Sequence, residues 1–241
     1  MVSTETASGQ LALAIAAQDK ASFDNFWTGS NTELVKALQA MTGVEGARVT
    51  YLYGPPGAGK SHLLFATLRM AERGKQPGSF QPLSNPHVSA EMLEMVDPAQ
   101  LVCLDDVHLW SGDAVKERAL FALFERIKHA GGRLLVTAAQ PPEKSGFGLR
   151  DLVSRLSSGL IYPLHELNDT QMLAALSLRA EQRGLSVTTD VFKYLLSRMS
   201  RDTTAIFGVL DDIDRASLAE QRRVTIPFIQ QLLKRAEDEP N

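Results

Sequence analysis

Hydrophobic residues follow two alternating patterns over the first two thirds of the chain. Short apolar runs bounded by turn residues are typical of buried strands, and apolar residues three or four positions apart are typical of helices. The runs predict strands at Val49–Tyr53, Leu101–Asp106 and Arg133–Ala138, with a weaker candidate between Gly74 and Asn85. Helical spacing predicts a helix that Asn31 or Ser30 caps and that runs to about Thr42, and further helices at Lys60 to about Arg73, Ser89 to Met95 and Asp113 to His129. This alternation predicts an α/β fold, a parallel sheet with helices on both faces and ligands beyond the carboxyl ends of its strands.

The pattern becomes purely helical after Leu164. Four amphipathic stretches follow, and their expected caps are Asn168 or Asp169, Thr189, Asp202 and Thr225, with Gly184 ending the first. The sequence therefore predicts a small all-helical lid domain after the sheet. We expect a tail over residues 1–22, a nucleotide-binding domain over 23–166 and a helical lid over 167–241.

The composition is that of a globular protein, with 44% hydrophobic and 22% charged residues. The single cysteine, Cys103, excludes an internal disulfide and fits a reducing cytoplasm. The apolar stretch Leu11–Ala17 is too short to cross a membrane, and no Lys or Arg precedes it as a signal peptide would require. A net charge of −3 argues against strong direct binding of duplex DNA.

The segment between the first predicted strand and the following helix has the spacing of a phosphate-binding loop. Its backbone N–H groups and the positive end of the helix would surround a phosphate, while a lysine adds a mobile cation. The terminal serine offers a hydroxyl to a Mg²⁺ ion that bridges the outer phosphates. The residues are Gly54, Pro55, Pro56, Gly57, Ala58, Gly59, Lys60 and Ser61. They predict binding of ADP or ATP together with Mg²⁺.

Two carboxylates end a predicted strand about 45 positions after the loop, as expected for a parallel neighbour in the same sheet. We assign Asp105 to the metal, with Ser61, and Asp106 to the orientation or activation of a water. The simpler alternative is that one or both carboxylates cap the following turn.

The order of these features resembles the AAA+ ATPases, and specifically the DnaA branch. The resemblance covers nearly the whole chain and rests on seven segments, which are FDNFW, GPPGAGKSHLL, LVCLDDV, RLLVTAAQPP, DLVSRLSSGLIYPL, LDDIDRAS and TIPFIQQLL. The phosphate loop alone indicates only a superfamily. The segments at the domain junction and in the lid narrow the resemblance to the DnaA branch.

The resemblance implies further site residues. Phe23 and Phe26 would flank the nucleotide base, with packing in the core as the alternative. His62 follows the loop and is grouped with it, with packing or capping as its alternative. Arg155 matches the family's arginine finger, which points at the nucleotide of a neighbouring subunit; without the resemblance, Arg150 and Arg155 would be equivalent candidates.

Two positions depart from the family pattern. Ala139 stands where the family usually has the polar sensor 1 residue, which leaves Thr137 as the nearby polar candidate. Thr204 stands at the position of the sensor 2 arginine, and Arg201 would face another side of the helix. We expect these changes to weaken the chain's own hydrolysis more than its nucleotide binding.

A finger beside a weakened site suggests a protein that completes a partner's ATPase site. By resemblance the partner is ATP-bound DnaA, and hydrolysis of the DnaA-bound ATP would stop reinitiation of chromosome replication.

Near the N-terminus, four residues resemble a peptide that docks on the DNA polymerase sliding clamp, namely Gln10, Leu11, Leu13 and Ile15. A homo-oligomer is also possible, because the arginine finger needs a neighbouring subunit, which could be a second copy of this chain. The alternatives are a helicase-loader-like AAA+ adaptor and a small-molecule kinase on a P-loop fold.

Overall fold

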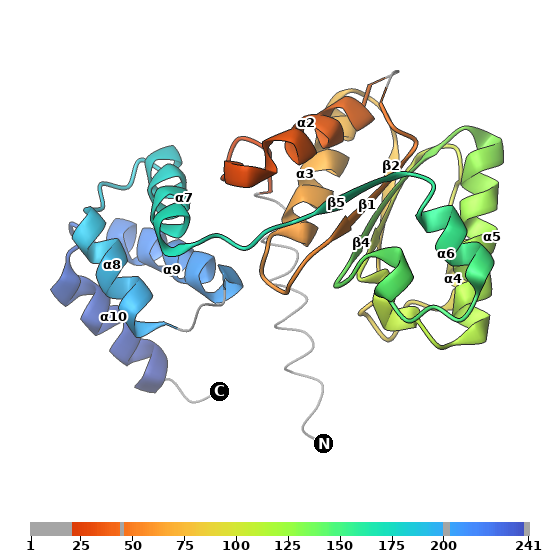
Figure 1. Ribbon diagram of the computed structural model, residues 1–241. Coiled ribbons are helices and arrows are strands. Elements are labelled where there is room, and N and C mark those ends of the chain that lie inside the picture. The colour runs from red at the N-terminus through yellow and green to blue at the C-terminus, as the bar shows by residue number, and fades with distance from the viewer. Residues whose placement is uncertain (1–20, 44–45, 200–202, 239–241) are drawn as a thin grey trace. The chain divides into compact units, whose positions relative to one another are not determined.

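The computed structural model describes residues 21–43, 46–199 and 203–238, without the side chains of residues 204 and 236–238 (Figure 1). The residues predicted to dock on the clamp, Gln10, Leu11, Leu13 and Ile15, lie outside this part, as do Arg201 and Asp202. The chain divides into two compact units between His165 and Glu166. In the described ranges no helix has both the length and the apolar character needed to cross a bilayer.

The first unit is built on a five-stranded sheet in the order β2-β3-β4-β1-β5, and all neighbours pair in parallel. The strands are β1 (Val49–Tyr53), β2 (Gly78–Pro82), β3 (Leu101–Asp105), β4 (Arg133–Ala138) and β5 (Leu160–Pro163). Because the strands are parallel, their carboxyl ends share one edge of the sheet. The phosphate loop after β1 and the carboxylates at the end of β3 therefore meet at that edge.

Helices cover both faces of the sheet, and short 3-10 turns precede some of them (Figure 1). The helices of this unit are α2 (Thr32–Met41), α3 (Lys60–Arg73), α4 (Ala90–Glu94), α5 (Ala114–Ala130) and α6 (Arg150–Leu156). The 3-10 turns are η1 (Gly29–Asn31), η2 (Val107–Trp110) and η3 (Pro142–Lys144). Helices α2 and α3 pack on one face, and α4, α5 and α6 pack on the other.

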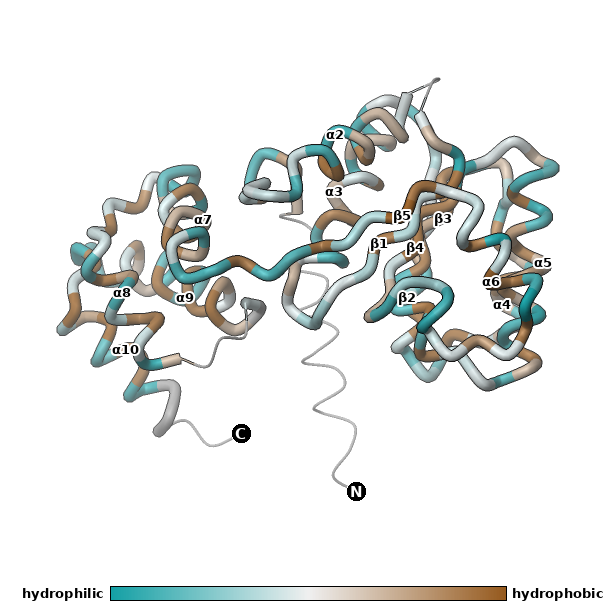
Figure 2. The backbone as a smooth tube through the Cα atoms, viewed as in Figure 1, coloured by the Kyte–Doolittle hydropathy of each residue, from teal (hydrophilic) through white to brown (hydrophobic). Residues whose placement is uncertain are grey.

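The two faces form separate cores because successive strand side chains point in opposite directions. In β1, Tyr51 belongs to the core under α5 and α6, whereas Leu52 belongs to the core under α2 and α3. Val102 and Cys103 divide in the same way in β3. Figure 2 shows the resulting hydrophobic runs along β3 and β4. Both faces being buried explains why these strands appear as unbroken apolar runs in the sequence.

The second unit is all helical. Its helices are α7 (Asp169–Gln182), α8 (Thr189–Arg198), α9 (Thr203–Glu220) and α10 (Ile226–Asp238). Asn168 caps α7 in a reciprocal arrangement with Gln171, and Gly184 follows that helix with a φ of 71°. Helix α8 is shared between two small cores, one with α7 and α9 and the other with α9 and α10.

The predicted elements are present, with three local differences. Strand β3 ends at Asp105 rather than Asp106, and α8 is capped by Thr188 while Thr189 is its first helical residue. Helix α6 was not predicted, because seven residues hold only two turns and show little periodicity. It forms because Leu152 and Leu156 are buried in the core on the α5 face.

Candidate functional site

The phosphate loop connects β1 to α3 with a backbone that specific glycines allow. Gly57 and Gly59 have φ values of 76° and 97°, in the left-handed region that favours glycine. Gly54 is buried, and a Cβ atom there would lie 2.4 Å from the carbonyl oxygen of Leu164. The loop therefore needs glycine at all three positions, and α3 begins within the motif, at Lys60.

The side chain of Lys60 bonds back to the start of the phosphate loop. Its Nζ donates to the carbonyl oxygens of Gly54 at 2.8 Å and Pro55 at 2.9 Å, and the residue is 8% exposed. Burial lowers the pKa of Lys60, while the nearby carboxylates of Asp106 and Asp105 oppose that shift. A cation held by two neutral carbonyls can transfer its hydrogen bonds to a phosphate, which adds an opposite charge.

Ser61 and Asp105 are brought together from the loop and from β3. The Ser61 Oγ donates to Asp105 Oδ2 at 2.7 Å, and the Thr137 hydroxyl donates to the other carboxylate oxygen. Asp105 is 6% exposed, and burial raises its pKa, while the two hydroxyls lower it. A hydroxyl and a carboxylate oxygen are hard ligands of the kind that Mg²⁺ prefers, so this pair fits a magnesium ion.

Asp106 projects from a strained backbone next to this pair. Its φ is 59°, which is uncommon for a residue with a side chain, and its N–H donates to Thr137 Oγ1 at 2.9 Å. Thr137 is fully buried and makes hydrogen bonds with both acidic residues. Its hydroxyl therefore orients the acidic pair.

His108 is a polar residue of this site that sequence reasoning missed. Its Nδ1 accepts from the Ala139 N–H at 3.3 Å and lies 4.0 Å from Asp106 Oδ1. Burial lowers the pKa of His108, while Asp106 raises it. His108 comes three residues after Asp105 in the sequence, but no motif marks it. The η2 turn places it beside Ala139, the residue predicted to occupy the sensor 1 position.

Phe23, Phe26 and His62 lie on the α2–α3 side of the loop. The two phenylalanines are partly buried against that core, and the Phe26 and His62 rings are 5.6 Å apart. His62 Nε2 lies 3.0 Å from the carbonyl oxygen of Ser22. A Cβ atom on Gly59 would lie 2.9 Å from the Phe26 ring, so this aromatic residue covers the end of the loop.

A pocket of about 520 Å³ opens beside the loop. Its walls come from the ends of β1, β4 and β5 and from the residues after them, including Tyr53, Pro56, Ala139, Gln140 and His165. It thus lies beyond the carboxyl ends of the parallel strands, where ligands of open α/β sheets bind.

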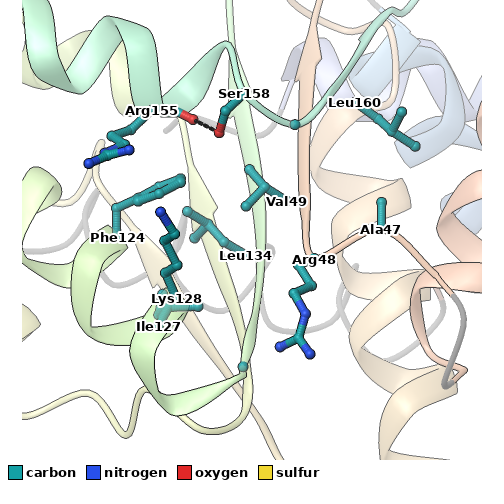
Figure 3. Close-up of a pocket in the computed structure, with 12 residues that line it drawn as sticks. Ala47, Arg48, Val49, Phe124, Ile127, Lys128, Leu134, Arg155, Ser158 and Leu160 are labelled. Atoms are coloured by element: carbon teal, nitrogen blue, oxygen red, sulfur yellow. Dashed lines mark hydrogen bonds between the residues drawn. The ribbon is translucent and has the colours of Figure 1, made fainter.

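Arg155 lies at the opposite edge of the sheet. It lines a second pocket of about 430 Å³ with Val49 and Leu134, which are near the amino-terminal ends of β1 and β4 (Figure 3). The five residues of β1 separate this edge from the loop by roughly 16 Å at about 3.3 Å per residue. The Arg155 side chain is 39% exposed, and its Nε lies 2.7 Å from Glu125 Oε1. Arg155 therefore does not belong to the chain's own phosphate site.

Two family models match this chain. The model of the bacterial DnaA ATPase domain matches residues 17–163, and the model described as the Hda lid domain matches residues 169–233. The first match alone covers more than half of the 241 residues.

Solved structures show the same fold at low sequence identity. Domain III of the Thermotoga maritima replication initiation protein DnaA is 18% identical, with a TM-score of 0.71 over 89% of this chain and 95% of that one. AMPPCP-bound DnaA from Aquifex aeolicus is 23% identical, with a TM-score of 0.63 over 80% and 65%. A DNA replication initiation factor is 23% identical, with a TM-score of 0.61 over 81% of this chain, which spans only 64% of that factor. These matches confirm the predicted α/β fold with a helical lid.

Proposed function

This chain belongs to the AAA+ family of bacterial DnaA ATPase domains, and from that premise we propose that it regulates replication initiation by making ATP-bound DnaA hydrolyse its nucleotide. In this role the chain resembles the DnaA regulatory inactivator Hda, whose lid model matches its second unit. The observation that carries the proposal is the place of Arg155, at the sheet edge opposite the phosphate loop. An arginine at that edge is too far from the chain's own loop to act on its nucleotide, and we propose that it acts on the nucleotide of a neighbouring subunit.

The chain's own site is proposed to bind ADP or ATP. Lys60 and the backbone N–H groups of the loop bind the phosphates, and the pocket beside Gly54 and Pro56 offers space for the rest of the ligand. The AMPPCP-bound relative supports this assignment. Phe26 is the aromatic residue nearest the loop and is proposed, with Phe23, to border the base.

Ser61 and Asp105 would hold Mg²⁺, which neutralises phosphate charge when bound. Their 2.7 Å hydrogen bond supports this assignment, because the two oxygen atoms are close enough to be ligands of the same ion. Asp106 is proposed to orient a water, since its backbone is fixed by Thr137 while its side chain remains 31% exposed.

The chain's own hydrolysis is proposed to be weak. Thr137 makes hydrogen bonds with both members of the acidic pair, and Ala139 presents only a methyl group at the sensor 1 position. Thr204, at the sensor 2 position, lacks the charge of the family's arginine. The nucleotide would then act mainly as a structural ligand, and the partner would be the turning-over ATPase. The peptide with Leu11 and Leu13 is proposed to hold the regulator on the sliding clamp in the cytoplasm.

The test is a phosphate-release assay that mixes the protein with clamp, DNA and ATP-loaded DnaA. We expect release to far exceed the sum of the separate proteins. Arg155→Ala should abolish the stimulation, because arginine fingers contribute about 10³- to 10⁵-fold in rate. Arg150→Ala is the matched control, since Arg150 is an exposed arginine on the same helix. Equal stimulation by wild type and Arg155→Ala would refute the proposal.

The same assay separates the alternatives. A helicase-loader-like adaptor would bind single strands and a replicative helicase and would leave DnaA-bound ATP intact. A kinase would turn over ATP with a small acceptor and would need a mobile, arginine-rich lid. The two internal cores of the second unit describe a packed bundle instead.

A further inference from the structure

The contact between Arg155 and Glu125 is an ion pair between two elements. Arg155 lies in the last turn of α6, and Glu125 lies on α5, and the Nε to Oε1 distance is 2.7 Å. The two side chains are 39% and 25% exposed. An ion pair that is partly shielded from water fixes a guanidinium more firmly than an exposed one does.

Glu125 pairs with Arg155 although a cation on its own helix is nearer in sequence. Lys128 is three positions further along α5 and exposed, which is the spacing of a helical ion pair. Among the ion pairs of residues 21–43, 46–199 and 203–238, however, Lys128 has none. Figure 3 shows Lys128 and Arg155 on the Phe124 side of the pocket, with Arg48 on the other. The carboxylate is thus directed towards α6.

The pair neutralises charge without using the hydrogen-bonding capacity of the guanidinium. The buried Glu125 Oε1 accepts no hydrogen bond, and Arg155 donates none within the described ranges. Buried polar atoms are usually satisfied, so an exception calls for an explanation. Here the Nη atoms keep the planar fork that binds a phosphate through two parallel hydrogen bonds.

We propose that Glu125 is a positioning residue for the finger: its carboxylate holds the Arg155 guanidinium by charge at the Nε edge and leaves the Nη edge free for a phosphate of the partner's nucleotide. This inference rests on the proposed function. Glu125 does not touch the reacting atoms. It reduces the number of orientations that Arg155 samples before docking, which lowers the entropic cost of reaching the transition-state contact.

The experiment measures stimulated phosphate release as a function of regulator concentration, for full-length variants with clamp, DNA and ATP-loaded DnaA. For Glu125→Ala we expect the maximal stimulated rate to fall by about tenfold or more, with a smaller change in the half-maximal concentration. Glu125→Gln, which keeps an oxygen at this position without the charge, should fall between wild type and Glu125→Ala. Lys128→Met is the matched control on the same helix and should behave as wild type.

A double-mutant cycle separates this inference from the proposed function. If Glu125 acts only through Arg155, Glu125→Ala should change nothing in the Arg155→Ala background. Loss of stimulation in Arg155→Ala with a normal or increased maximal rate in Glu125→Ala would overturn the positioning role and leave the proposed function standing. Normal stimulation in Arg155→Ala would overturn both. If Glu125→Ala fails to fold, the near-isosteric Glu125→Gln decides by the same criteria.

Discussion

Ser61 Oγ donates a hydrogen bond to Asp105 Oδ2 over 2.7 Å, although the two residues are 44 positions apart. The contact joins the first turn of α3 to the end of β3, so the loop and the acidic pair form one site. The sequence spacing indicates two strands of one sheet but gives no distance between these atoms. Parallel pairing of the strands places both residues at the same edge of the sheet and so brings the two atoms within hydrogen-bonding distance.

Asp105→Asn should weaken nucleotide binding only when Mg²⁺ is present. The amide keeps the shape of the side chain and an oxygen for Thr137, but it removes the charge that would hold the metal. Loss of a residue that only supports a metal ligand typically costs about 10- to 100-fold in metal affinity, so loss of a ligand itself should cost at least as much. Calorimetry of ADP binding with and without Mg²⁺ measures the effect. Unchanged affinity in the presence of Mg²⁺ would remove Asp105 from the site.

Gly59→Ala should destabilise the first unit more than Gly112→Ala does. Both glycines have positive φ values, 97° and 82°, so alanine is strained at each by about 1–2 kcal/mol. Only at Gly59 does the added Cβ atom meet another side chain, the Phe26 ring at 2.9 Å, while nothing lies within 4 Å at Gly112. Thermal unfolding of the two variants compares the costs. Equal losses of stability in Gly59→Ala and Gly112→Ala would show that Phe26 does not pack against Gly59.

Glu117→Gln should destabilise the protein at neutral pH by about 1–3 kcal/mol. The carboxylate is 2% exposed and accepts from the N–H groups of Gly112 at 2.7 Å, Gly148 at 3.0 Å and Leu149 at 2.7 Å. It thereby fixes the start of α6, which carries Arg155. Glutamine retains only one of the two acceptor oxygens, and it adds donors that face other donors.

The same variant should change the pH dependence of stability. Burial raises the pKa of Glu117, but the N–H groups of Gly148, Leu149 and Gly112 lower it further, and the net pKa lies below the ordinary value. A pKa lower in the folded state stabilises the protein above the unfolded-state pKa, and that contribution is lost as pH falls through the folded-state pKa. Urea unfolding from pH 7 downwards should show the two proteins converging in acid. The exposed Glu33→Gln is the control, and a gap that stays constant with pH would contradict the assignment.

Replacing Leu11 and Leu13 with Ala should weaken retention on the sliding clamp by at least about 2 kcal/mol if these residues are the anchors. Surface plasmon resonance with immobilised clamp measures the loss, and phosphate release from ATP-loaded DnaA should fall in parallel. Nucleotide binding should stay unchanged, which serves as the internal control. If the double variant bound the clamp as tightly as wild type, Leu11 and Leu13 would not be the anchors.

The sequence predicted the elements whose patterns are local. The apolar run of Leu101–Asp105 and the capping sequence at Asn168 depend on neighbours within a few residues, and both appear as expected. Helix α6 was missed because its seven residues are stabilised by burial of Leu152 and Leu156 rather than by periodicity. His108 was missed because an isolated histidine carries no spacing signal, and only the η2 turn brings it to Ala139.

The sequence by itself determined the chemistry of this protein, because a phosphate loop and a strand that ends in carboxylates are local patterns whose residue types fix what they can bind. Only the tertiary structure decided which of these groups meet. Parallel pairing of the strands brings Ser61 to Asp105 at one edge of the sheet, and packing of α6 on α5 puts Arg155 beside Glu125 at the other. Both contacts join elements far apart in the chain, and their distances depend on how the side chains fill the two cores.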